Sequence, residues 1–119
     1  MNGEDGTFKG AVFVHVWGVI YMYVIYGRVE LHLPHSTSLK DKRQIIQSIV
    51  ARIRKRYSVS ISEVKHHDLW QRSDLGFAAV CNTFGETEAI STAIHDTLLQ
   101  HENDCQVIAF KDQVVRWDD

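Results

Sequence analysis

The sequence predicts an α+β fold with the element order βαββαβ. Three observations predict it. Apolar and polar residues alternate through 25–33, as in a half-buried strand. Two segments, 39–57 and 83–101, repeat apolar residues at helical spacing behind capping residues. Three further strand-like runs complete the pattern. At 119 residues, 45% hydrophobic and 24% charged, the chain has the size and composition of a single globular domain.

The first strand and the first helix are the clearest local predictions. Pro34, the only proline, ends the strand because it lacks a backbone N–H. Ser38 is a good N-cap, and Asp41 three residues later completes a capping-box pattern. A helix over 39–57 follows. Its apolar face is formed by Leu39, Ile46, Ile49, Val50, Ile53 and Tyr57.

The second half of the chain repeats this plan. Val59 and Ile61 alternate with serines in a strand that runs to about residue 67, and 68–72 form a turn. The run LGFAAVCN (75–82) predicts a more fully buried strand. Thr83 and Glu86 then repeat the capping-box pattern before the second helix, and 107–117 form the last strand.

This order predicts a ferredoxin-like fold: a four-stranded antiparallel sheet in the order 4-1-3-2, with two helices on one face. Two right-handed crossovers generate it. The first and second strands then run parallel, with the third between them. Their C-terminal ends and the start of the first helix should therefore lie at one pole of the molecule.

The charge distribution points to that same pole. The net charge of −2 gives no general reason to expect nucleic acid or an anionic membrane. Between residues 39 and 57, however, seven cations face one carboxylate. Lys40, Lys42 and Arg43 lie in the first turns, where the helix dipole disfavours cations unless an anion is near. We expect an anion-binding role there, with Ser38 at the cap, whereas the cations of 52–56 suit a solvated helix C-terminus.

The turn HHDLWQR (66–72) is the second polar motif. It either locks the turn, with Asp68 paired to Arg72 or Lys42, or offers Trp70 for stacking while Gln71 and Arg72 read a phosphate or base edge. A polar cluster of His32, His66 and Asp68 is expected at the same pole. A metal site is disfavoured, because adjacent histidines on a strand point to opposite faces.

Several segments resemble the YlxP-like family of small bacterial proteins. They are RVELHLP (28–34), SLKDKR (38–43), SEV (62–64) and HHDLWQRSDLG (66–76), within a similarity that runs from about residue 22 to the end. The resemblance implies the ferredoxin-like fold, but no established activity and no catalytic residues. Genes of this family commonly lie among those for transcription termination, translation initiation and ribosome maturation, which implies an RNA or ribosome context. Lys65 and His67 depart from the family pattern.

Residues 1–21 have no counterpart in the resemblance. We therefore divide the chain into an extension, 1–21, and a single domain, 22–119. Trp17, Gly18 and Val19 require codons that can spell a ribosome-binding site shortly before Met22. One hypothesis is that Met22 is the natural start and that the preceding residues are a translated leader. The alternative is a genuine additional strand or arm.

These patterns favour a non-enzymatic binding domain for RNA or a ribosome-associated particle. The first alternative is a protein-interaction or homodimerisation module; an enzyme acting on a small anionic substrate is the second. The face carrying Tyr26, Ala78 and Val80 is typical of a packing or dimer surface rather than an RNA platform. We expect a cytoplasmic homodimer or small homo-oligomer without cofactor, metal, catalytic residues or membrane association. Cys81 and Cys105 form no disulfide framework, which favours a reducing compartment.

Overall fold

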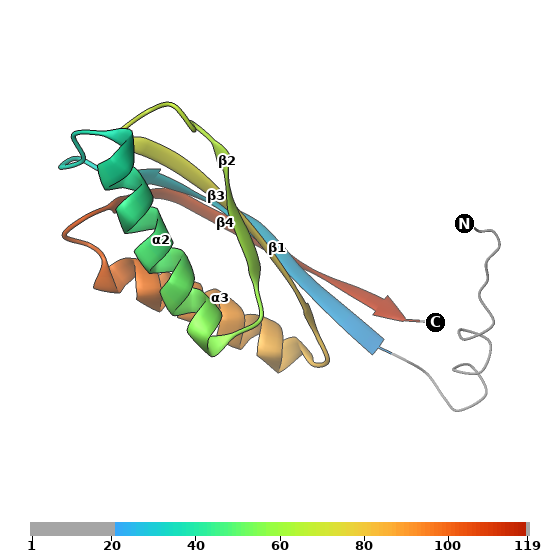
Figure 1. Ribbon diagram of the computed structural model, residues 1–119. Coiled ribbons are helices and arrows are strands. Elements are labelled where there is room, and N and C mark those ends of the chain that lie inside the picture. Colours follow the sequence, from blue (N-terminus) through green and yellow to red (C-terminus); the bar gives the residue numbers. More distant parts are fainter. Residues whose placement is uncertain (1–20, 119) are drawn as a thin grey trace.

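The computed structural model describes residues 21–118 and places four strands and two helices there (Figure 1). The element order is βαββαβ, as predicted. The elements are β1 (Tyr21–His32), α2 (Leu39–Arg56), β2 (Ser60–Lys65), β3 (Arg72–Cys81), α3 (Phe84–Gln100) and β4 (Gln106–Asp118).

The sheet has the order β2-β3-β1-β4, which is the predicted 4-1-3-2 read from the other edge. All three neighbouring pairs are antiparallel. Both helices cover the same face of the sheet (Figure 1). Because β1 and β2 each pair antiparallel with β3, they run in the same direction and end at one pole. The ferredoxin-like prediction is confirmed.

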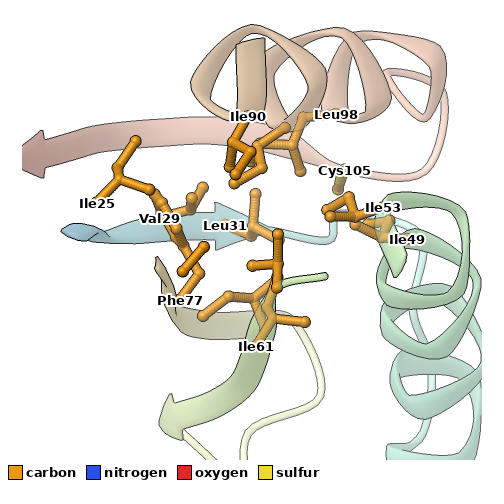
Figure 2. Close-up of a cluster of buried hydrophobic side chains, with 14 of the residues drawn as sticks. Ile25, Val29, Leu31, Ile49, Ile53, Ile61, Phe77, Ile90, Leu98 and Cys105 are labelled. Carbon is orange, nitrogen blue, oxygen red and sulfur yellow. The ribbon is translucent and has the colours of Figure 1, made fainter. Parts of the chain in front are cut away.

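A hydrophobic core lies between the sheet and the helices (Figure 2). Ile25, Val29 and Leu31 of β1 are at most 1% exposed, and they meet Ile49 of α2 and Ile90 of α3 within that cluster. Burial of each such side chain contributes about 1.5–3 kcal/mol. The alternation read from 25–33 is therefore the alternation between this core and the uncovered face of the sheet.

Both helices begin where the capping patterns predict. The Ser38 hydroxyl accepts a hydrogen bond from the Asp41 N–H, and the Thr83 hydroxyl accepts one from the Glu86 N–H. Each carboxylate then reaches back to the residue before the cap, Asp41 to Thr37 and Glu86 to Asn82. The two hydroxyls satisfy backbone donors that the first helical turn leaves free, and the two carboxylates hold the residue before each cap in place.

The strand boundaries differ from the prediction in three places. β1 begins at Tyr21 rather than Ile25, because β4 extends far enough for Asp118 to pair with it. β2 ends at Lys65, because His66 adopts a positive φ of 68° that does not continue a strand. β3 begins at Arg72 rather than 75. Except for Tyr21, the predicted extension lies outside the described residues, and the hypothesis about Met22 stays a prediction.

Candidate functional site

The two polar motifs meet at one pole, formed by the loop 33–38, the first turn of α2 and the turn 66–71. We call this region the α2 pole. The Leu33 N–H donates to the Gln71 carbonyl over 2.9 Å. The Gln71 side-chain amide donates to the carbonyls of Pro34 and Ser36, at 3.3 and 3.2 Å. Gln71 therefore fastens the turn to the loop before α2, and its amide N–H is not left free for a ligand.

Lys42 is the most buried charged group of the α2 pole. Its side chain is 1% exposed, and its ammonium donates to the carbonyls of His66, His67 and Arg72 at 2.7, 3.4 and 3.3 Å. Glu63 Oε2 lies 2.9 Å from Nζ and supplies the counter-charge. The prediction that Lys42 binds an external anion needs correction, because the ammonium is buried and already surrounded by acceptors.

Glu63 and Ser73 complete this internal network. The Ser73 hydroxyl, fully buried, donates to Glu63 Oε2, the oxygen that also faces Lys42. The predicted pairing of Asp68 with Lys42 is therefore wrong: Glu63 holds that place. Lys42 lies four residues before Ile46 and seven before Ile49, on the apolar stripe of α2. That spacing is the sequence signal for an inward-facing lysine.

The other cations of α2 face solvent. Lys40 and Arg43 lie in the first two turns and are exposed. Within residues 21–118, no carboxylate pairs with Lys40, Arg43 or the cations of 52–56. Arg54 donates to the Ile61 carbonyl of β2, and Arg52 to the side-chain carbonyl of Gln100. The outer side of α2 is therefore a basic surface that the described carboxylates leave uncompensated.

Trp70 projects from the turn next to Gln71 and is 54% exposed, with Leu69 beside it at 44%. Together with Asp68, Gln71 and Arg72 they line a shallow hollow of about 370 Å³. Asp68 is exposed and forms no ion pair with another described residue. Because Trp70 is more than half exposed, part of its indole is a surface available for stacking.

Arg72 does not share a pocket with Lys40 and Arg43. Its register partner is His32, whereas the adjacent Ser73 faces the helices. Because side chains alternate along a strand, the Arg72 guanidinium belongs to the uncovered face of the sheet. Its Nε is buried and has no hydrogen-bond partner among the described residues. At the α2 pole Arg72 contributes its carbonyl, which accepts from Lys42, and part of the lining of the hollow beside Trp70.

The predicted histidine cluster does not assemble. His32 Nδ1 lies 3.2 Å from Gln106 Oε1, and His66 Nε2 lies 3.8 Å from Asp74 Oδ1. Over the described range, no group of three or more His, Cys, Asp or Glu side chains is arranged to hold a metal ion. Sequence reasoning did not single out Asp74, which is 2% exposed and also pairs with Arg28 at 3.3 Å. Local sequence provides no signal for this burial, because the neighbouring Leu75 faces the core and so places Asp74 on the uncovered face of the sheet.

The thiols are poor nucleophiles. Burial raises the pKa of Cys105 to about 11, with a smaller contribution from the Asp104 carboxylate. Burial and the Glu86 carboxylate also raise the pKa of Cys81. Since the thiolate is the reactive form, neither cysteine is activated at neutral pH. No helix within residues 21–118 is long and apolar enough to cross a membrane.

The chain matches a family model described as a protein of unknown function, DUF503, over residues 24–112. This chain belongs to the DUF503 family. The match runs from β1 into β4 and includes the whole α2 pole. A curated relative is the uncharacterized protein YlxP of Bacillus subtilis strain 168, 43% identical over 51 residues. The aligned part is 43% of this chain and 55% of that relative, so the match spans about half of the relative's length. The predicted YlxP-like resemblance is confirmed.

Solved structures similar to this DUF503 chain include two designed proteins. The de novo designed protein Foldit4 superposes with a TM-score of 0.52 at 9% identity, over 79% of this chain and 96% of that one. The designed protein LFR1 1, with a ferredoxin fold, gives a TM-score of 0.43 at 12% identity, over 80% and 84% of the two chains. At such identities a structural likeness concerns the fold alone.

Proposed function

We propose that this DUF503 protein is a non-enzymatic RNA-binding domain that uses one stripe of exposed cations on α2, beginning at Lys40 and Arg43, and the indole of Trp70. The observation that carries the proposal is the lack of a described carboxylate partner for the cations on the outer side of α2. A chain of net charge −2 that leaves one helix this basic has concentrated its positive potential on one surface.

Lys40, Arg43, Gln47 and Arg54 recur at helical spacing and form one stripe along α2. The stripe rises over 14 residue steps from Lys40 to Arg54, which corresponds to about 21 Å at 1.5 Å per residue. Phosphates are about 3.4 Å apart per base-pair step along one strand of a B-form duplex, and folded RNA presents rows of similar density. A stripe of this length therefore suits several consecutive phosphates rather than one small anion.

Trp70 supplies the second element of the proposed interface. Gln71 fastens the turn to Ser36, two residues before the Ser38 cap, so that Trp70 lies near the first turn of α2. An exposed indole beside a basic helix can stack on an unpaired base, which contributes about 1–3 kcal/mol. Loops and bulges of folded RNA provide such bases next to closely spaced phosphates.

A titration of a fluorescent RNA hairpin with a single-stranded loop tests the proposal. The Lys40→Ala/Arg43→Ala variant should weaken binding about tenfold and lower the salt slope by about 1.5. The matched control is Lys55→Ala/Arg56→Ala, which removes the same charge from the other end of α2. An equal loss in both variants, or binding that salt does not weaken, would contradict a site at the α2 pole.

Trp70 is tested in the same assay. Trp70→Ala should weaken hairpin binding about fivefold or more and leave the salt slope unchanged, because stacking does not release counterions. Trp70→Phe should restore most of the affinity. Leu69→Ala removes an exposed apolar side chain from the same turn and should have little effect. If Leu69→Ala matches Trp70→Ala, the indole does not stack on a base.

A further inference from the structure

The edge strand β4 offers an unpaired backbone along its outer side. The sheet order ends at β4, and among the described strands only β1 pairs with it. β4 is 13 residues long, and each residue of Lys111–Asp118 is exposed. A long exposed edge presents a row of free N–H and C=O groups that readily pairs with another strand.

The opposite edge of the sheet is protected by comparison. β2 has six residues, its pairing with β3 shifts register between Glu63 and Lys65, and the Arg54 guanidinium donates to the Ile61 carbonyl over 3.1 Å. A short strand, a register shift and a charged side chain over the edge all discourage further pairing. The C-terminal part of β4 has none of these features.

The outer parts of β1 and β4 form a two-stranded arm (Figure 1). Pairing of β1 with β3 stops at Tyr23, whereas pairing with β4 continues to Tyr21. Tyr21 and Trp117 on this arm are each 50% exposed, and Val114 and Val115, which lie just inside it opposite Ile25 and Val24, are 38% and 49% exposed. Two strands alone are marginal in water, and a third strand would stabilise the arm.

The regular part of β4 is self-complementary. A register shift between Glu30 and Leu31 leaves Ile108 as an extra residue, so that regular pairing resumes at Ala109 and runs to Asp118. If a second copy pairs antiparallel about Val114, Asp112 lies opposite Arg116 of that copy, and Arg116 opposite its Asp112. Lys111 then faces Trp117 across the pair, and Val114 faces Val114. The two copies therefore form two ion pairs, and each strand contributes the acid of one pair and the arginine of the other.

Neighbouring registers lack this complementarity. An axis at Gln113 places Asp112 opposite a valine, and an axis at Val115 places Asp112 opposite Asp118. An axis at Asp112 or Lys111 sets like charges against each other. Opposite charges directly across a strand pair stabilise it and like charges destabilise it. Charge therefore selects Val114 among the axes from Lys111 to Val115.

Asp112 and Arg116 can form the intermolecular ion pair without losing strong interactions within their own chain. Asp112 accepts a hydrogen bond from the Ser91 hydroxyl at Oδ2, and Oδ1 has no described partner. Arg116 lies 3.0 Å from Asp118 on its own strand, with both side chains about half exposed, and its guanidinium lies 5.3 Å from the centroid of the exposed Tyr21 ring. Exposed pairs of this kind are weak, so Arg116 can turn to a second copy at little cost.

We propose that β4 is a homodimer interface in which two copies pair antiparallel about a two-fold axis at Val114, joining both sheets into one. The partner is a second copy of this chain, because the same strand provides both residues of each ion pair, of the valine contact and of the Lys–Trp contact. A symmetric interface of this type is isologous and does not propagate into a filament.

A charge-swap cycle tests the register. Sedimentation velocity over a concentration series should show a dimer for the native chain. Asp112→Arg sets two arginines opposite each other, and Arg116→Asp two aspartates, so each variant should raise the dimer dissociation constant about tenfold or more. The double variant Asp112→Arg/Arg116→Asp should recover native dimerisation. A native chain that stays monomeric at about 100 µM, a concentration well above typical specific dissociation constants, would overturn the proposal. So would equal weakening in all three variants.

Cross-linking tests the axis directly. In Val114→Cys the two introduced thiols face each other across the axis, whereas in Gln113→Cys and Val115→Cys each thiol lies opposite a different residue. Mild oxidation with copper–phenanthroline should cross-link Val114→Cys into a covalent dimer much faster than either control. Both native cysteines are buried and do not interfere. Equal rates at the three positions would exclude the proposed register even if the chain dimerises.

Discussion

The two edges of the sheet, β2 and β4, differ in how far other described residues of the chain protect them. On the β2 side, a buried lysine bonds three carbonyls and a carboxylate, and an arginine covers the edge of β2. On the β4 side, a long strand is exposed and its apolar side chains are about half uncovered. Polar groups that are satisfied internally stabilise the fold, whereas exposed apolar groups and free backbone edges are available to partners. The difference separates residues that hold the fold from residues that meet another molecule.

The largest effect on stability should come from Lys42, on the β2 side of the sheet. Lys42→Ala removes the ammonium that joins α2 to the turn 66–72 and leaves Glu63 without its counter-charge. Breaking such a buried pair costs about 3–5 kcal/mol. Urea unfolding should show this loss in the free energy of unfolding. The control Lys40→Ala, two residues away and exposed, should stay within about 0.5 kcal/mol of the native chain.

If Lys42→Ala and Lys40→Ala unfolded at the same urea concentration, Lys42 would not hold the α2 pole together. The conclusion that Lys42 stabilises the fold, while Lys40 is free to bind RNA, would then be wrong.

Glu63→Gln should have an intermediate effect. The amide keeps an oxygen that can accept from Lys42 or Ser73, but it loses the negative charge that balances the buried ammonium. Hydrogen bonds to charged groups contribute about 1.5–3 kcal/mol, and we expect a loss in this range in urea unfolding. Glu30→Gln, an acid on β1 that pairs with the exposed Arg28, is the matched control and should cost less. A larger loss in Glu30→Gln would contradict this ranking.

The arm should tolerate substitution far better. Trp117 is 50% exposed and lies where β1 has no β3 neighbour, so Trp117→Ser should change the stability of the monomer by less than about 0.5 kcal/mol. The measurement is urea unfolding at low protein concentration, where a dimer would dissociate. A loss of several kcal/mol in the monomer would show that the arm belongs to the core and is not a surface for a partner.

The sequence predicted the fold well, because each element carries a local signal that agrees with the others. Ser38 and Thr83 start the helices, and the alternation from Ile25 fixes the face of β1 that enters the core. The four residues before Ile25 are all apolar and show no alternation, and the first two of them, Tyr21 and Met22, lie beyond the end of β3, where there is little core to face. The start of β1 depends on how far β4 pairs along it, and the residues around Tyr21 alone do not predict the extent of that pairing.

The candidate site was predicted only in part, because residue type alone does not say whether a cation is inside or outside. Lys42 and Arg43 are adjacent and chemically similar, yet one is buried and the other exposed. Helical phase separates them: Lys42 shares the stripe of Ile49, and Arg43 does not. The same phase argument places Glu63 on the side of Ile61 and Ser73 on the side of Leu75. Periodicity therefore indicates which of these polar side chains face the core, whereas the motifs alone do not.

The smallest expected effect concerns Asp41, at the border between the buried and exposed parts of the α2 pole. Hydrogen bonds from the Thr37 hydroxyl and the Thr37 N–H, with smaller contributions from Ser38 and Lys40, hold the pKa of Asp41 below its ordinary value of 3.8. A lowered pKa means that the folded state favours the ionised carboxylate. Its contribution to stability is therefore present above pH 3.8 and is lost as the pH falls through the folded-state pKa.

Asp41→Asn should consequently be slightly less stable than the native chain at pH 7, and the difference should shrink as the pH falls below 3.8. Thermal unfolding across this pH range measures it. The Thr37→Ala background removes the hydroxyl that contributes most to the lowered pKa, so Asp41→Asn should cost less there at pH 7. A difference that does not vary with pH would mean that Asp41 acts at this helix start through its shape and not through its charge.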